Sequence, residues 1–140
     1  NIQEFATAMC QETNIIVCVL NNYYLGMVRQ IQQLFYGKRY EATCLKRRKA
    51  CPPRCKGPGE DCPPYEPDFV KLAEAMGAKG YRVTSQEEFK EAFKEALESE
   101  VPVLIDCIIN CDDKVWPMVA PGEAISSSFT GEDLAKKQQS

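Results

Sequence analysis

The sequence predicts an α/β fold: an open, doubly wound and mostly parallel sheet with helices on both faces. Two continuous apolar runs, at residues 15–20 and 101–109, have the pattern of strands that are covered on both faces, as in a parallel sheet. Segments with helical periodicity alternate with these runs, which is typical of βαβ units. With 140 residues, of which 44% are hydrophobic and 26% charged, the chain has the size and composition of one globular domain.

Two helices flank the first predicted strand. Phe5 and Met9 belong to one apolar face of an opening helix, so the chain begins inside an amphipathic element and without a methionine. We therefore expect it to be a segment of a longer protein. The strand at 15–20 ends in two asparagines, and a second amphipathic helix is predicted over residues 25–36, where Gly37 ends it.

The second half of the chain continues the alternation. One helix opens at Pro67-Asp68 and stops at Gly77. A short strand is predicted at residues 81–83. Ser85, followed three residues later by Glu88, is a capping box that opens a helix with a regular apolar stripe, and the second long apolar strand comes after it.

Residues 1–125 are predicted to form one domain, with an irregular insertion at 41–66 and a polar tail at 126–140. The insertion has neither helical nor strand periodicity and is rich in proline and glycine. It is too long for an ordinary connection, so we expect an internal staple. The polar tail is expected to be partly disordered.

The chain has eight cysteines and no histidine. Four of the cysteines lie in the insertion: Cys44, Cys51, Cys55 and Cys62. Four thiolates could hold Zn²⁺ or an iron–sulfur cluster, although the spacing lacks the C-x2-C pair of zinc ribbons, and disulfides or free thiols are the alternatives. Elsewhere, Cys10, Cys18 and Cys107 lie among apolar neighbours, where a free thiol behaves as a small buried hydrophobe.

Composition excludes several function classes. The net charge of −3 argues against a general affinity for nucleic acid or an anionic membrane surface. No apolar run approaches the length needed to cross a bilayer, and no signal segment is present at the start. The absence of histidine removes the commonest general acid–base and every mixed Cys/His zinc site. We expect a cytoplasmic protein.

The junction between the first strand and the second helix is the best candidate for a ligand site. In parallel α/β sheets, ligands bind beyond the carboxyl ends of the strands. A helix start offers free backbone amides and the positive end of its dipole to a phosphate, and amide and carbonyl oxygens suit Mg²⁺. From these residues alone, an asparagine-capped helix after a strand is the favoured interpretation.

Several colinear strings resemble the catalytic subunits of acetolactate synthases. The string LNNYYLGMVRQIQQLFYGKRY is similar to that family's LNN-x-x-LGMVRQ-WQ-x-LFY-x-x-RY segment, and NIQEFATA resembles the helix after its GDG motif. The strings PDFVKLAEAMGAKGYRV, PVLIDCII and PMVAPGEAI resemble its later elements. The resemblance covers nearly the whole chain apart from the insertion and the tail, and it implies part of the carboxy-terminal domain that binds thiamine diphosphate.

The resemblance also implies one half of a cofactor site. The family's magnesium-ligating asparagine matches Asn22, and the carbonyl two residues later, at Tyr24, would be a second Mg²⁺ ligand. The residues that would contact the diphosphate and the aminopyrimidine of thiamine diphosphate are Tyr24, Leu25, Gly26 and Met27. Ile31 stands where the family usually has a tryptophan facing the acceptor pocket, so acceptor preference does not follow from the resemblance.

Other parts of the family's site have no match in this chain. The GDG motif with its metal-ligating aspartate, the domain whose glutamate contacts the pyrimidine, and the FAD-binding domain are absent from the sequence. No catalytic residue is therefore assigned, and the chain alone is expected to be inactive. The resemblance implies three kinds of protein partner: the rest of the catalytic subunit, a second catalytic subunit in a homodimer, and a small regulatory subunit.

The reaction implied by the resemblance is the condensation of two pyruvates, or of pyruvate and 2-ketobutyrate, with loss of CO₂ in branched-chain amino-acid biosynthesis. One alternative is another thiamine-dependent 2-keto-acid carboligase or decarboxylase. A second, from a different class, is a non-catalytic metal or redox module built on the four cysteines. A third is a natural split subunit that pairs with a separate amino-terminal chain.

Overall fold

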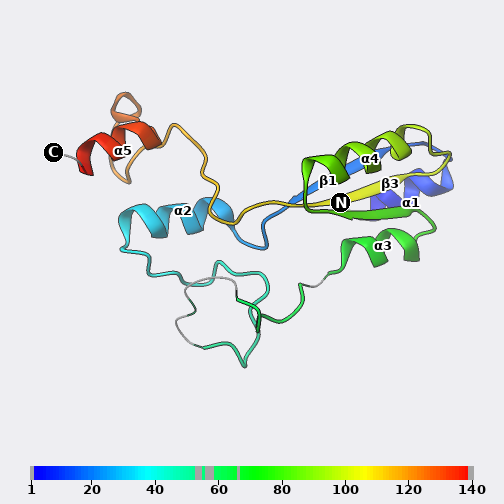
Figure 1. Ribbon diagram of the computed structural model, residues 1–140, viewed down its shortest axis with the longest axis horizontal. Coiled ribbons are helices and arrows are strands. Elements are labelled where there is room, and N and C mark those ends of the chain that lie inside the picture. Colours follow the sequence, from blue (N-terminus) through cyan, green and yellow to red (C-terminus); the bar gives the residue numbers. More distant parts are fainter. Residues whose placement is uncertain (1, 53–54, 56–58, 66, 139–140) are drawn as a thin grey trace.

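Three parallel strands form the only sheet in the described part of the chain. The computed structural model describes residues 2–52, 55, 59–65 and 67–138. The strands are β1 (Ile16–Asn21), β2 (Lys79–Val83) and β3 (Val103–Ile108), in the order β1-β3-β2 (Figure 1). Both pairings are parallel. Five of the six residues of the central strand β3 are buried, which is why its sequence is a nearly continuous apolar run.

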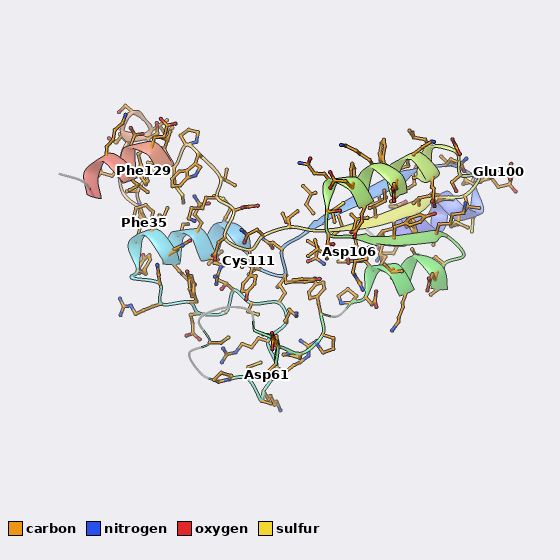
Figure 2. The ribbon with its side chains drawn as sticks, in the orientation of Figure 1. Phe35, Asp61, Glu100, Asp106, Cys111 and Phe129 are labelled. Atoms are coloured by element: carbon orange, nitrogen blue, oxygen red, sulfur yellow. The ribbon has the colours of Figure 1, made fainter. Side chains whose placement is uncertain are left out.

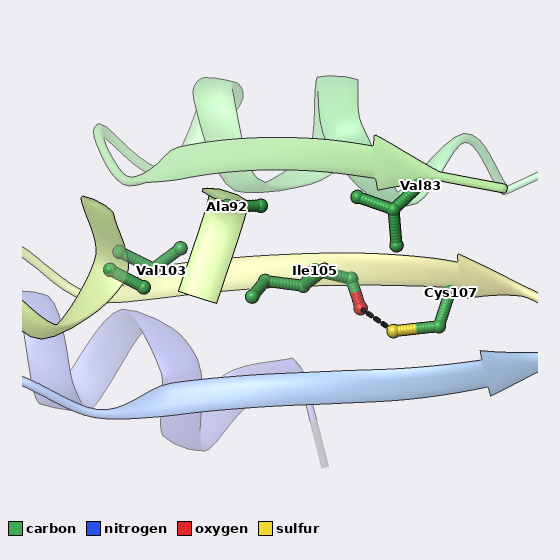
Figure 3. Packing of buried hydrophobic residues seen from close by; sticks show 6 residues of the cluster. Val83, Ala92, Val103, Ile105 and Cys107 are labelled. Carbon is green, nitrogen blue, oxygen red and sulfur yellow. Dashed lines mark hydrogen bonds between the residues drawn. The ribbon is translucent and has the colours of Figure 1, made fainter. Parts of the chain in front are cut away.

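Helices cover both faces of this sheet, as predicted. On one face lie α1 (Ile2–Cys10) and α3 (Phe69–Ala75), and on the other lies α4 (Gln86–Leu97). The first face is closed by a cluster that contains Phe5, Ala73, Ala78 and Leu104. The second is closed by Val83, Ala92, Ala96, Val103, Ile105 and Cys107, most of which are drawn in Figure 3. Alternate residues of β3 thus point into opposite cores, as the pleat of a strand requires.

Local sequence signals explain the ends of α3 and α4. Asp68 caps α3 by accepting hydrogen bonds from the backbone amides of Val70 and Lys71. Ser85 caps α4 by accepting one from the Glu88 amide at 3.2 Å. The Glu88 carboxylate reaches back to the amide of Thr84, one residue before the usual partner of a capping box.

A glycine sets the distance between α3 and the sheet. A Cβ atom at Gly80 of β2 would lie 2.8 Å from the carbonyl oxygen of Val70. The helix therefore approaches β2 more closely than any side chain at this position would allow. Hydrogen bonding also extends β2 back to Lys79, whose amide donates to Pro102, so the strand begins two residues before the predicted range 81–83.

One face of β1 is not covered by any helix of the described residues, and the prediction that Cys10 and Cys18 are buried is wrong. Cys107 is buried as predicted, but Cys10 and Cys18 are exposed. Cys18 and Leu20 lie beside Ile105 and Cys107 of β3, on the face that α4 covers. Because α4 packs mainly on β2 and β3, this face of β1 remains open and Leu20 is 71% exposed.

The second helix, α2 (Gly26–Phe35), does not cover the sheet. It lies apart from it, beside the carboxy-terminal segment that contains η1 (Ile125–Ser127) and α5 (Gly131–Gln138) (Figure 1). The Phe35 ring packs edge-on against Phe129 with 6.1 Å between centroids (Figure 2). The Trp116 ring also contacts Phe129, with 5.9 Å between centroids.

The prediction of a partly disordered tail is wrong for residues 131–138, which form α5. The amide of Thr130 donates to the Asp133 carboxylate at 2.8 Å, and the Asp133 amide donates back to the Thr130 hydroxyl at 3.4 Å. This reciprocal capping starts a helix in a polar segment whose composition alone suggested disorder. No helix in the described ranges is long and apolar enough to cross a membrane.

Candidate functional site

The candidate site is the turn between β1 and α2, at the carboxyl edge of the sheet. The Asn21 side-chain oxygen accepts a hydrogen bond from the Tyr23 amide at 3.0 Å, and the Asn22 side-chain oxygen accepts one from the Tyr24 amide at 2.9 Å. Tyr23 has a φ of 61°, in the left-handed region that non-glycine residues seldom occupy. Two consecutive asparagine-to-backbone bonds therefore shape this turn.

The cysteine-rich insertion holds the turn from one side. Tyr24 and Cys44 form an isolated antiparallel bridge. Its two hydrogen bonds run from the Leu45 amide to the Tyr23 carbonyl and from the Leu25 amide to the Thr43 carbonyl, both at 2.9 Å. These bonds do not involve the Tyr24 carbonyl, which is the group predicted as a metal ligand.

The start of α2 carries the other predicted residues. Leu25 is the residue before the helix and makes no side-chain capping bond. A Cβ atom at Gly26 would lie 2.9 Å from the side-chain nitrogen Nδ2 of Asn22, so glycine allows the Asn22 side chain to lie against the helix start. Leu25 and Met27 are 47% and 50% exposed, and Ile31 follows Met27 by one helical turn. The predicted residues therefore lie together on one loop and the first helical turns after it.

The buried face of α2 is polar, which its apolar pattern did not indicate. Its buried residues are Arg29 and Gln30. The Arg29 guanidinium donates to one oxygen of Asp112 at 3.0 and 3.1 Å and lies over the rings of Tyr24 and Tyr40, at 4.6 and 4.0 Å from their centroids. Burial lowers the pKa of Arg29, but the Asp112 carboxylate outweighs this effect and raises it above the ordinary value.

Gln30 ties α2 to the chain beyond the sheet. Its side chain donates to the Val115 carbonyl at 2.9 Å and accepts from the Val115 amide at 2.9 Å. Such paired bonds fix the orientation of the amide and replace a missing backbone partner. Two adjacent polar residues, Arg29 and Gln30, stand in the motif and could have indicated a buried polar contact. Their partners, however, lie more than eighty residues away in the chain.

A buried carboxylate lies directly beneath the turn. Asp106 is 1% exposed and accepts hydrogen bonds from the Asn21 side-chain amide and from Arg82 Nε, each at 3.0 Å (Figure 2). Arg82 also donates to Asp68 at 2.8 Å. The hydrogen bond to Asp106 is the main reason that the pKa of Arg82 is raised. This network was missed from the sequence, although a single aspartate inside the run VPVLIDCII was a visible signal.

Comparison with known proteins decides the family. Residues 1–107 match the family described as thiamine pyrophosphate enzyme, C-terminal TPP binding domain. The chain belongs to this family. The fold class predicted from the apolar runs and the family predicted from the motifs are thereby confirmed.

Individual relatives of this thiamine pyrophosphate enzyme domain are much longer. The chain is 36% identical over 126 residues to the acetolactate synthase large subunit of Cyanidium caldarium, covering 90% of this chain and 19% of that protein. It is 42% identical over 125 residues to the acetolactate synthase large subunit of Corynebacterium glutamicum, covering 89% and 18%. The chain thus spans less than a fifth of the length of these relatives.

A solved structure shares the fold. The thiamine diphosphate-dependent 4-hydroxybenzoylformate decarboxylase of Rhodococcus jostii RHA1 superposes with a TM-score of 0.54 and 26% sequence identity, covering 78% of this chain and 17% of that one. In the thiamine pyrophosphate enzyme domain described here, the start of α2 is chemically suited to a diphosphate. Its first amides have no side-chain cap, and the dipole of the helix favours an anion there.

The four cysteines of the insertion converge beside this site. Cys44, Cys51, Cys55 and Cys62 line one cavity of about 30 Å³ together with Tyr24 and Arg29. None of the four is paired in a disulfide, and within the described ranges no three or more Cys, Asp or Glu side chains are arranged to hold a metal ion. Backbone amides of Arg48 and Gly59 contact the sulfurs of Cys51 and Cys62 at 3.4 and 3.2 Å. The structure gathers the thiols without arranging them as a ligand set.

Cys44 also influences the turn electrostatically. Burial raises the pKa of the Tyr24 phenol, and the neighbouring Cys44 thiol raises it further. A tyrosine hydroxyl is protonated at neutral pH even at its ordinary pKa, so Tyr24 can act as a hydrogen-bond donor inside the cavity.

Proposed function

We propose that this chain supplies the diphosphate-binding half of a thiamine diphosphate site in the catalytic subunit of an acetolactate synthase. The observation that carries the proposal is the turn from Asn22 to Met27, which brings oxygen ligands and an uncapped helix start together at the carboxyl edge of a parallel sheet. Family membership supports the cofactor, and the names of the relatives support the reaction. That reaction condenses two pyruvates, or pyruvate and 2-ketobutyrate, with loss of CO₂ in branched-chain amino-acid biosynthesis.

Mg²⁺ would bind to Asn22 and Tyr24. Both groups are hard oxygen donors, which this ion prefers. The Asn22 amide oxygen accepts one hydrogen bond from the Tyr24 amide, and a carbonyl oxygen has a second lone pair for a metal. The Tyr24 carbonyl lies outside the bridge to the insertion, so the donor set of the turn fits the ion in kind.

The apolar residues at the start of α2 would orient the cofactor and the acceptor. Leu25 and Met27 expose about half of their surface instead of filling a core, which suits side chains that pack beside a pyrimidine ring. Ile31, one turn further along, would face the acceptor. When it is bound, thiamine diphosphate supplies the carbon–carbon bond chemistry, and the residues of this chain bind and orient it.

Activity requires partners in this proposal. The GDG aspartate, the glutamate that contacts the pyrimidine and the FAD-binding domain belong to other parts of the catalytic subunit. A second catalytic subunit would complete the site in a homodimer, and a small regulatory subunit could bind the assembly. We place the assembly in the cytoplasm. The chain alone would not turn over pyruvate.

The rival function is that of another thiamine diphosphate-dependent 2-keto-acid decarboxylase. The fold likeness to 4-hydroxybenzoylformate decarboxylase favours it. Identity is higher to the acetolactate synthase relatives, at 36% and 42% compared with 26%, so we favour the synthase. The two functions differ in product, because a decarboxylase releases an aldehyde without joining a second keto acid.

The test measures acetolactate formed from pyruvate with Mg²⁺, thiamine diphosphate and FAD present. It is run on this chain alone and on this chain combined with the amino-terminal part of the catalytic subunit. We expect activity only in the combination, and we expect Asn22→Ala to abolish it. Asn14→Ala is the matched control, because Asn14 donates to the Ser99 carbonyl at 2.8 Å near the opposite edge of the sheet.

Three outcomes would contradict the proposal. Acetolactate from the chain alone would show that the missing aspartate and glutamate are not required. Acetaldehyde without acetolactate from the combination would favour the decarboxylase. Equal loss of activity in Asn22→Ala and Asn14→Ala would indicate general destabilisation and would remove Asn22 from the metal site.

A further inference from the structure

We infer that Asp106 and Arg82 are positioning residues that hold the Mg²⁺-binding turn in place through Asn21. The inference rests on the proposed function, since it concerns how the turn that carries Asn22 is held. Asn21 is 5% exposed and is not one of the proposed metal ligands. Its side chain connects Asp106 in the sheet to the Tyr23 amide in the turn.

The burial of Asp106 calls for a reason beyond stability. It lies in the central strand with 1% of its surface exposed, among residues that are otherwise apolar. Removing a carboxylate from water costs several kcal/mol, and pairing it with a cation often only offsets that cost. An apolar residue of similar volume would stabilise a strand at least as well. The hydrogen bond to Asn21 gives the carboxylate a specific purpose.

Asp106 determines which way the Asn21 amide faces. An ionised carboxylate only accepts hydrogen bonds, so Asn21 must present its amide nitrogen, which lies 3.0 Å from Asp106 Oδ1. The Asn21 oxygen is then turned toward the Tyr23 amide, 3.0 Å away. If the Asn21 amide were flipped, an oxygen would face the carboxylate and an amide nitrogen would face the Tyr23 amide. Both contacts would be repulsive.

The orientation of Asn21 in turn places Asn22. The bond from Tyr23 to Asn21 holds Tyr23 at a φ of 61°. This left-handed residue reverses the chain and lets the Tyr24 amide reach the Asn22 oxygen at 2.9 Å. The proposed metal ligands on Asn22 and Tyr24 are therefore separated from Asp106 by a short series of directional hydrogen bonds.

Arg82 completes the arrangement from the other side. Its Nε donates to Asp106 Oδ2 at 3.0 Å, so each carboxylate oxygen has its own donor and the group cannot rotate freely. The same guanidinium donates to Asp68, the cap of α3, at 2.8 Å. The turn, which follows β1, is thereby tied to the other two strands of the sheet and to the start of α3.

The experiment uses the complete catalytic subunit that carries this segment. Two quantities are measured for each variant: the Mg²⁺ concentration that half-saturates thiamine diphosphate binding, followed by calorimetry, and the midpoint of urea unfolding. Asp106→Asn should raise the half-saturating Mg²⁺ concentration about tenfold, the lower end of the effect of altering the groups that orient metal ligands. The kcat at saturating Mg²⁺ should change much less, because the ion itself restores the ligand geometry.

An exchange of the two residues distinguishes positioning from bulk stability. In the double variant Asn21→Asp with Asp106→Asn, the new amide at position 106 can donate to the new carboxylate at position 21. That carboxylate can still accept from the Tyr23 amide, and Arg82 can still donate to the amide oxygen at position 106. We expect the exchange to return the half-saturating Mg²⁺ concentration to within about threefold of the parent value, a far smaller change than for either single variant.

Two further variants keep the test decisive. Val103→Ala removes a fully buried side chain from the same strand and should lower the unfolding midpoint without changing the half-saturating Mg²⁺ concentration. If Asp106→Asn does not fold, Arg82→Leu replaces it, since the Arg82 side chain is 42% exposed and Asn21 still donates to the Asp106 carboxylate in this variant. It should raise the half-saturating concentration several-fold.

The outcomes separate this inference from the proposed function. If the parent subunit shows no Mg²⁺-dependent binding of thiamine diphosphate, the proposed function is wrong. If the parent binds and Asp106→Asn or Arg82→Leu behaves as Val103→Ala does, the positioning role alone is overturned. Failure of the exchange to restore Mg²⁺ binding in a folded protein would also overturn it.

Discussion

Replacing Gly26 by alanine should weaken cofactor binding without lowering the stability of the fold. Gly26 begins α2, and alanine favours a helix over glycine by up to about 1 kcal/mol. The new Cβ atom, however, would lie 2.9 Å from the side-chain nitrogen Nδ2 of Asn22, whereas ordinary van der Waals contacts begin at 3.4 Å. The difference of 0.5 Å between these two distances must be absorbed by one of the two groups.

The Asn22 side chain is the group that should move. It is the end of a side chain on a turn, while Gly26 is anchored in helical backbone. Mg²⁺ demands ligand distances of roughly 2.0–2.1 Å with near-ideal octahedral angles, so a shift of this size in a ligand is large. Gly26→Ala should therefore leave the free energy of unfolding unchanged or slightly higher and weaken Mg²⁺-dependent binding of thiamine diphosphate at least about tenfold.

The assay pairs urea unfolding with calorimetric titration of thiamine diphosphate at several Mg²⁺ concentrations. Gly37→Ala is the matched control, because Gly37 has a φ of 59° and nothing within 4 Å of a new Cβ atom. It should lose about 1–2 kcal/mol of stability from left-handed strain and keep its Mg²⁺ affinity. A Gly26→Ala variant that binds Mg²⁺ and cofactor as the parent does would refute the placement of Asn22 against the helix start.

Two other predictions concern titration and thiol chemistry. Burial alone would raise the pKa of Asp68, but the hydrogen bonds from Arg82 and from the amides of α3 lower this pKa below its ordinary value of 3.8. The contribution of Asp68 to stability is therefore present above that value and is lost as the pH falls through the lower, folded-state pKa. Acid titration of the unfolding free energy should show this loss, and Asp68→Asn should remove it; an unchanged acid profile in the variant would contradict the assignment. Burial also raises the pKa of the Cys107 thiol, so at neutral pH an aromatic disulfide reagent should label Cys10 and Cys18 well before Cys107, as followed by peptide mass spectrometry. Equal labelling rates would show that the face of the sheet under α4 opens readily.

Much of the fold could be predicted because its signals are local. The apolar run of β3 is long enough to show that both faces are covered, and Ser85 and Asp68 mark their helix starts within a few residues. The same holds for the candidate site, since the residues from Asn22 to Met27 follow one another in the chain. Their resemblance to a family motif was therefore visible without knowledge of the fold.

The errors arose where a local pattern had two valid interpretations. The pattern of α2 predicted an amphipathic helix with an apolar face, but its buried residues are Arg29 and Gln30, whose partners are Asp112 and Val115. Polar composition suggested a disordered tail, yet Thr130 and its partner three residues later start a helix there. In each case, distant contacts or a cap outweighed the average composition of the segment.

The sequence by itself determined the parallel α/β class, the order of the elements and the position of the turn proposed to bind the cofactor, because these follow from hydrophobic periodicity, caps and contiguous motifs. Only the tertiary structure decided which buried polar groups meet. Asn21, Arg82 and Asp106 come from three strands, and the parallel register that places Asn21 beside Ile108 and Arg82 beside Asp106 brings all three to one edge. Hydrogen bonds between side chains depend on such three-dimensional proximity, which no pattern along a single segment encodes.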